Sequence, residues 1–311
     1  TLTLMVGTAG LPHVIIRFYT VPKASDARWS AGWALVFIGL LYTTAPAVAV
    51  FSKYNLLNTL ANKPVEEVRQ IDWVQKWEQT GLLKLQDKNG DGILQMSANP
   101  DVNEVTIDRD IIVLSTPEVA KLSPFIVGLV AAGGLAAALS TAAGLLIVIA
   151  SAISHDLYTR LINPGASEAT KLLIARVVIF LVVVLAAPFG INPPAFIAQL
   201  VAFAFGLAAS TFFPAILLGI FDRRMNMQGA VAGMIVGLVF TASYIIGTKY
   251  LGWPNFILGI TAEGIGAIGM LLNFVVAYLV SRATPPPPEE IQHLVDEIRI
   301  PKGSAGSALE H

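Results

Sequence analysis

Seven apolar runs in this sequence are long enough to cross a lipid bilayer, and they constrain the fold more than any other feature. A transmembrane helix needs about 20 mostly apolar residues. The chain is 55% hydrophobic and only 13% charged, whereas a soluble domain carries roughly 25% charged residues. These features predict an all-α polytopic membrane protein with apolar segments at 1–20, 31–52, 124–154, 172–187, 194–221, 229–248 and 259–280.

The spacing of these runs predicts the domain organisation. The chain begins without Met and inside an apolar segment, and we expect it to be part of a longer protein. Its last residues, "GSAGSALEH", are typical of a linker and tag. We expect two transmembrane segments over 1–52, the first of them broken; an external loop over 53–122; five transmembrane helices over 123–282; a cytoplasmic tail over 283–302; and a linker or tag over 303–311.

The charges of the connections predict how the chain crosses the membrane. Basic residues gather in cytoplasmic loops. They occur here in alternate connections and at the end of the last segment, at Arg17, Lys23, Arg28, Arg160, Lys171, Arg223, Arg224 and Arg282. The connection at 188–193 has no charge, and the long stretch at 53–121 is acidic on balance. We therefore expect a multi-pass protein with a cytoplasmic C-terminus. The expected location is a bacterial inner membrane.

Composition and motifs argue against several classes of protein. The 20 basic and 21 acidic residues nearly cancel, which gives no field for nucleic acid. The chain has no cysteine, so disulfides and cysteine metal sites are excluded. No serine has a histidine and a carboxylate at motif spacing, and no phosphate-binding glycine loop occurs. We do not expect an enzyme.

Two intramembrane features could carry transport chemistry. "GTAGLPH" interrupts the first segment, and such breaks mark substrate sites in transporters, although a packing kink is the alternative. In the third segment, Ser140 and Thr141 are adjacent hydroxyls, and the carbonyl of Ala137 lies one turn earlier. These oxygens would supply part of a sodium shell, although hydroxyls in membrane helices also serve close packing. We interpret the glycines of "GAVAGMIVG" as helix packing only.

The stretch "LQDKNGDGILQ" resembles a calcium-binding EF-hand loop. Asp87, Asn89 and Asp91 match positions 1, 3 and 5, and Ile93 would offer its carbonyl at position 7. Position 12, usually Glu, is Ala98, for which Asp101 or Glu104 is the candidate substitute. An ordinary acidic turn is the alternative. We expect the preceding residues, 64–83, to form one amphipathic helix over the external mouth.

Three longer motifs resemble the solute:sodium symporter family, in its cation/acetate symporter-like branch. They are "GTAGLPHVIIRFYTVP", "GGLAAALSTAAGLLIVIASAISHDLY" and "FGLAASTFFPAILLGIF". The resemblance covers residues 1 to about 282. It implies a LeuT-type fold of which this chain would hold the second inverted repeat and the C-terminal helices. The first repeat would be absent from this chain.

The resemblance also implies site residues. The sodium site would take a carbonyl from Ala137 and hydroxyls from Ser140 and Thr141, and its other half would belong to the absent repeat. The substrate cavity would be lined by Gly7, Thr8, Ala9 and Gly10, with Phe203 and Phe205 as candidates on the opposite wall.

The sequence therefore predicts a sodium-coupled symporter for a small organic anion, most simply a short-chain monocarboxylate such as acetate. The alternatives are a symporter for an amino acid such as proline and a membrane sensor with a transporter-like domain. Calcium is a second expected ion. Proton coupling and a small membrane accessory subunit stay open.

Overall fold

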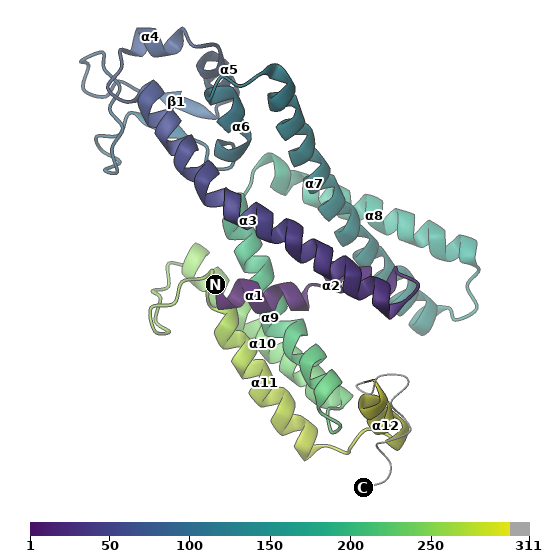
Figure 1. Cartoon of the computed structure of the whole chain (residues 1–311). Coiled ribbons are helices and arrows are strands. Elements are labelled where there is room, and N and C mark those ends of the chain that lie inside the picture. Colours follow the sequence, from purple (N-terminus) through teal and green to yellow (C-terminus); the bar gives the residue numbers. More distant parts are fainter. Residues whose placement is uncertain (299–311) are drawn as a thin grey trace. The chain divides into compact units, whose positions relative to one another are not determined.

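The computed structural model describes residues 1–298, so the predicted linker or tag lies outside the described residues. The chain forms two compact units. One contains Thr1–Thr20 and the chain from Val183 onward, and the other contains Val21–Val182. Both are mainly helical (Figure 1), which confirms the all-α class.

The first unit packs three long helices against one another, and the N-terminal segment lies on one of them, α9. α1 and α9 pack against each other, as do α9, α10 and α11. Its elements are α1 (Leu2–Gly10), α2 (Pro12–Ile15), the 3-10 turn η1 (Ile16–Tyr19), α9 (Ile197–Phe221), α10 (Met227–Tyr250), α11 (Gly266–Ala283) and α12 (Glu289–Glu297).

Small residues at four-residue spacing form the seam between α10 and α11. On α10, a Cβ at Gly229 would collide with the Ser281 hydroxyl, and one at Gly233 would collide with the Asn273 side chain. Residues four apart share one face of a helix, so the backbones of these antiparallel neighbours approach closely along this line. The glycines therefore serve packing, as predicted.

At the end of the first unit that holds α12, ionic contacts link the ends of α9, α11 and α12. Arg282, in the last turn of α11, donates two hydrogen bonds to Asp222, of 2.7 and 3.2 Å. Arg223 donates from Nε to Asp296 of α12 at 2.6 Å. Three of the basic residues used to predict the cytoplasmic face, Arg223, Arg224 and Arg282, thus gather at one end of this unit.

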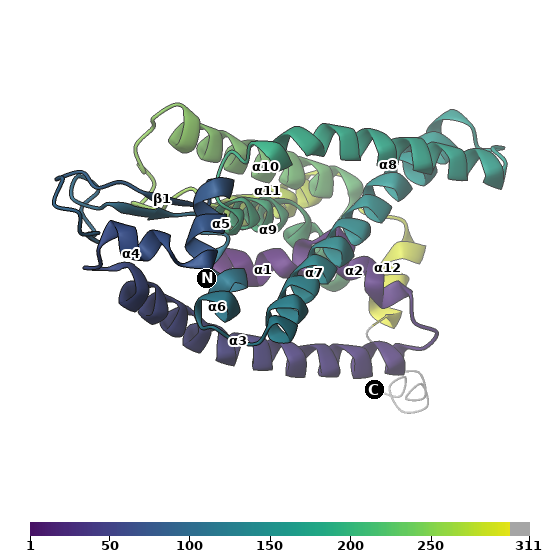
Figure 2. The same ribbon diagram turned by 90° about the horizontal axis from the view of Figure 1, so that it is seen from above.

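The second unit combines long apolar helices with a small polar lobe. Figure 2 shows α3 as one long helix with the lobe near its C-terminal end. Its elements are α3 (Ala24–Leu60), α4 (Val65–Arg69), α5 (Asp72–Thr80), β1 (Leu83–Leu85), β2 (Val105–Ile107), α6 (Ile112–Val119), α7 (Pro124–Ser151) and the π-helical η2 (Ala152–Ile162); α8 (Glu168–Ile191) continues from this unit into the other.

The lobe between α3 and α7 has its own hydrophobic core. Trp73 and Trp77 of α5 stack edge to face at 4.7 Å between ring centroids, among buried side chains that include Val68 and Leu94. β1 and β2 pair antiparallel, with Leu83 opposite Ile107. The sequence predicts one helix over 64–83 and no strands, whereas the structure has two short helices and this pair of strands.

Six helices of the described residues are long and apolar enough to cross a membrane, against seven predicted segments. The first predicted segment, 1–20, is interrupted at Leu11 and does not form one continuous helix. Several helices run beyond their predicted ends: α3 reaches Leu60, and its 37 residues span about 56 Å. Its apolar side chains, including Trp33, Phe37 and Tyr42, are exposed in the unit, as lipid-facing side chains would be.

Candidate functional site

The break in the N-terminal segment is built by Leu11 and Pro12. Leu11 has extended backbone angles (φ −78°, ψ 115°), which end α1, and Pro12 occupies the first turn of α2. Proline suits that position because the first amides of a helix have no partner within it. The main chain at Leu11 therefore departs from helical hydrogen bonding next to α9.

The four predicted substrate residues before the break lie on two different faces of α1. Gly7 and Gly10 are buried against α9: a Cβ at Gly7 would collide with the Phe205 carbonyl, and one at Gly10 would lie 2.6 Å from the Ala208 carbonyl oxygen. Thr8 and Ala9 are exposed within the unit. The two glycines thus allow close packing, and the side chains of Thr8 and Ala9 point away from α9.

The two predicted phenylalanines stand on α9 and are partly buried. Phe205 contributes its backbone to the contact with α1. Phe203 packs against a cluster that contains Tyr244 and Ile265, and the Lys249 ammonium lies 6.0 Å from its ring centroid. The structure therefore brings Phe205 to the glycine face of α1 and places Phe203 beside a cation.

A polar cluster that the sequence analysis missed surrounds this cation. Lys249, at the end of α10, lies 3.2 Å from the carboxylate of Glu263, which also accepts a hydrogen bond from Gln199. Partial burial raises the pKa of Glu263, but hydrogen bonds from Thr261, Gln199, its own backbone and Lys249 outweigh burial and lower the pKa to about 2. The carboxylate stays charged and fixes the ammonium beside Phe203.

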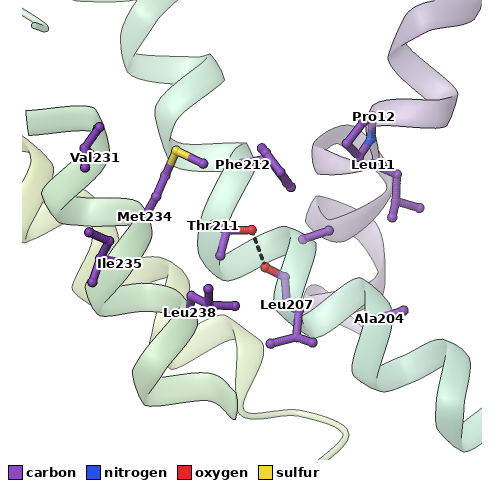
Figure 3. A pocket seen from close by; sticks show the side chains of 11 residues that line it. Leu11, Pro12, Ala204, Leu207, Thr211, Phe212, Val231, Met234, Ile235 and Leu238 are labelled. Atoms are coloured by element: carbon purple, nitrogen blue, oxygen red, sulfur yellow. Dashed lines mark hydrogen bonds between the residues drawn. The ribbon is translucent and has the colours of Figure 1, made fainter. Parts of the chain in front are cut away.

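An apolar groove of about 540 Å³ opens next to the helix break (Figure 3). Its one polar side chain, Thr211, donates its hydroxyl to the Leu207 carbonyl within the same helix at 2.6 Å. The walls offer no charge to a carboxylate, so the groove suits apolar groups. Its lining residues come from the break, α9 and one face of α10: Leu11, Pro12, Ala204, Leu207, Ala208, Thr211, Phe212, Val231, Met234, Ile235 and Leu238.

The predicted sodium ligands stand on one exposed face of α7, in the other unit. Ala137, Ser140 and Thr141 are spaced three and four residues apart, and Thr141 donates its hydroxyl to the Ala137 carbonyl at 3.0 Å. Two of the three oxygens are therefore adjacent, and the hydroxyl of Ser140 shares their side of the helix. A row of neutral oxygens fits a hard cation, but three ligands alone leave its shell open.

The acidic loop of the lobe is ordered by its own side chains. Asp87 accepts hydrogen bonds from the amides of Gly90 (2.7 Å) and Gly92 (2.9 Å), both of which have left-handed backbones. Asn89 and Asp91 each accept from the amide two residues later, that of Asp91 and of Ile93. Such turns suit an EF-hand-like loop and an ordinary Asx turn alike.

Glu104 folds back into this loop and is only 2% exposed. Its carboxylate accepts hydrogen bonds from the amides of Lys88 (2.8 Å), Asn89 (3.4 Å) and Gln95 (2.9 Å). Among the described residues, no three His, Cys, Asp or Glu side chains are grouped so that they could hold a metal ion. One of the two candidate substitutes for position 12, Glu104, thus binds backbone amides of the loop.

Comparison with known proteins finds transporters. A profile of the sodium:solute symporter family matches residues 96–237. An uncharacterized symporter of Cupriavidus necator is 41% identical over 304 residues, which are 95% of this chain and 43% of that protein. A monocarboxylic acid transporter of Corynebacterium glutamicum is 32% identical over 250 residues, which are 76% of this chain and 36% of that protein.

The chain thus spans less than half the length of these curated relatives. Neither relative is named as an enzyme. The residues that match the family profile include the whole of α7 and α9. The predicted resemblance is confirmed: over the matched residues, this chain is similar to the sodium:solute symporter family.

Proposed function

We propose that this chain is part of a sodium-coupled symporter that carries a small organic anion, a short-chain monocarboxylate such as acetate, across a bacterial inner membrane. The observation that carries the proposal is the 41% and 32% identity to bacterial proteins named as a symporter and a monocarboxylic acid transporter. The organisms of these relatives also support the bacterial location.

The geometry supports transport in two ways. The N-terminal segment is interrupted at Leu11 beside a packed helix, and interrupted membrane helices are where transporters bind small solutes. The oxygens of Ala137, Ser140 and Thr141 supply one side of an ion site. In the proposal, a LeuT-type first repeat outside this chain completes that site, and Thr8, Ala9, Phe203 and Phe205 face the solute while Gly7 and Gly10 hold α1 on α9.

Substrate class is tested by exchange in proteoliposomes that contain the full-length protein. Vesicles preloaded with unlabelled acetate should take up radiolabelled acetate, and propionate should compete whereas proline should not. Exchange of proline with no exchange of acetate would favour an amino-acid symporter. Binding of a solute without exchange would favour a sensor.

Calcium binding by the acidic loop is a separate proposal, supported by the left-handed glycines and the repeated side-chain turns of residues 87–93. Extracellular calcium modules work at about 10⁻⁴ to 10⁻³ M. Millimolar calcium should slow proteolysis of residues 61–122, and the double variant Asp87→Ala with Asp91→Ala should cancel this protection. Equal cleavage rates with calcium and with chelator would show that the loop does not bind calcium and is an ordinary turn, which Glu104 stabilises.

A further inference from the structure

A proline stands inside α9 at a buried position. Pro214 has no amide hydrogen, so the carbonyl of Ser210, four residues earlier, has no donor in the helix ladder. Both residues are almost completely buried between helices. Neither water nor lipid can serve a carbonyl there, so another part of the chain must supply the donor.

Asn273 of α11 supplies it. Its side chain is fully buried, and its amide nitrogen donates to the carbonyl oxygens of Ser210 at 2.8 Å and of Thr211 at 2.9 Å. The two hydrogens of one amide group thus meet two successive carbonyls beside the proline. A side chain of α11 replaces the backbone amide that Pro214 removes from α9.

The glycine seam makes room for this contact. A Cβ at Gly237 would collide with the Ser210 carbonyl, and a Cβ at Gly233 would collide with Oδ1 of Asn273. That Oδ1 has no hydrogen-bond donor among the described residues. A flipped amide would set its oxygen against two carbonyl oxygens, so the surroundings fix its orientation.

The part of α9 around Pro214 faces the break in the N-terminal segment. A Cβ at Gly10, next to Leu11, would lie 3.2 Å from the Phe213 backbone nitrogen. Thr211 and Phe212 line the groove together with Leu11 and Pro12. The part of α9 that Asn273 caps is therefore the part that meets the helix break on which the proposed function rests.

We propose that Asn273 is a positioning residue: it caps the carbonyls beside Pro214 and so holds the wall of α9 that faces the Leu11–Pro12 break. Without the cap, the two halves of α9 change their angle at Pro214. Solute affinity then falls, because the wall moves relative to α1. The cap itself is argued from the two hydrogen bonds of Asn273. Only its effect on solute affinity rests on the proposed function.

The cap is tested by a double-mutant cycle in the full-length protein. Asn273→Leu removes the donors at similar volume and should lower the thermal unfolding temperature in detergent. Pro214→Ala restores a backbone amide for Ser210, so Asn273→Leu should cost less in that background. Ser281→Ala is the control, because the Ser281 hydroxyl bonds to the Ala277 carbonyl of its own helix and contacts the Met225 sulfur, and makes no hydrogen bond to the described residues of α9. Additive effects of Asn273→Leu and Pro214→Ala would overturn the cap.

A second experiment tests, independently of stability, whether Asn273 positions the α9 wall of the groove. The chain has no native cysteine, so maleimide labelling of Phe212→Cys, measured on the peptide that contains it, reports the groove. Asn273→Leu should change this labelling rate several-fold, and Pro214→Ala should restore it. An unchanged rate would overturn the positioning role.

The link to transport is read from kinetics. Asn273→Leu should raise the KM for solute several-fold with little change in kcat, whereas Ser281→Ala should change neither. A changed labelling rate with unchanged KM would overturn the effect on affinity. Absence of uptake by the wild-type protein would instead refute the proposed function, and the cap would then be judged from the thermal cycle and the labelling.

Discussion

At the scale of single residues, the hydroxyls of α7 carry the proposed ion chemistry. Thr141 donates to the Ala137 carbonyl at 3.0 Å, so its oxygen keeps lone pairs free for a cation on the exposed side of the helix. Ser140→Ala and Thr141→Ala should each raise the sodium concentration for half-maximal uptake, at normal protein yield. Thr141→Ser keeps the hydroxyl and should retain the wild-type value. Unchanged sodium dependence in both alanine variants would reduce the pair to a packing role.

Glu263 gives a prediction about pH. Its folded pKa of about 2 lies below the ordinary value of 4.5. The ionised carboxylate therefore contributes stability that is fully present above pH 4.5 and is lost as the pH falls through about 2. Because the pair with Lys249 is partly exposed, this contribution is on the order of 0.5 to 1 kcal/mol.

The measurement compares thermal unfolding of the wild type and Glu263→Gln. Their difference should be constant above pH 4.5 and should shrink steadily toward pH 2. The variant Glu66→Gln changes an exposed carboxylate of α4 and serves as the control. A difference that already disappears at pH 5 would show that the contacts to Lys249 and Gln199 do not hold this carboxylate.

At the scale of helices, the seam of α9, α10 and α11 depends on backbone approach at glycines. Gly237→Ala places a methyl group against the Ser210 carbonyl, which is backbone and cannot move aside alone. Overpacking of this kind costs about 1–3 kcal/mol. Thermal unfolding should therefore occur at a lower temperature in this variant.

Gly219→Ala is the matched control for this seam. Gly219 also lies in a long helix, α9, but nothing stands within 4 Å of a Cβ added there. Alanine favours helix over glycine by about 0.5–1 kcal/mol, so this variant should be neutral or slightly more stable. Equal effects at both positions would contradict the close approach at Gly237.

The elements differ in how far the sequence predicts them. The long apolar runs and the stop at "GLPH" are local signals, and the structure has helices and a break at those places. The pairing of β1 with β2 was missed because the two strands are three residues each and lie about 20 residues apart, so neither carries a period of its own. The break between α4 and α5 was missed because the apolar spacing continues across it.

The candidate sites show the same limit. The hydroxyl pair and the acidic loop are runs of neighbouring residues, and the sequence analysis found them. The side chain of Asn273 acts through carbonyls more than 60 residues away, and Glu263 pairs with Gln199, 64 residues away, as well as with Lys249. One sequence does not reveal such partners. A proline inside a predicted membrane helix, Pro214, was the available signal, because the carbonyl that it leaves without an amide partner requires another donor.

At the scale of the whole molecule, the candidate groups fall into two units. The three oxygens of α7 belong to one unit, and the broken helix with α9, α10 and α11 belongs to the other. Under the proposed function, coupling between ion and solute would involve residues of both units, together with the part of the full-length protein outside this chain. The relatives are more than twice as long as the part that matches, so the central claim is tested on the complete protein.

The most direct measurement is acetate uptake by proteoliposomes of the full-length protein under an inward sodium gradient. We predict uptake against the acetate gradient that stops when choline replaces external sodium or when an ionophore removes the sodium gradient. Because a sodium-coupled symporter draws its energy from that gradient, uptake that continues unchanged in choline would contradict the account.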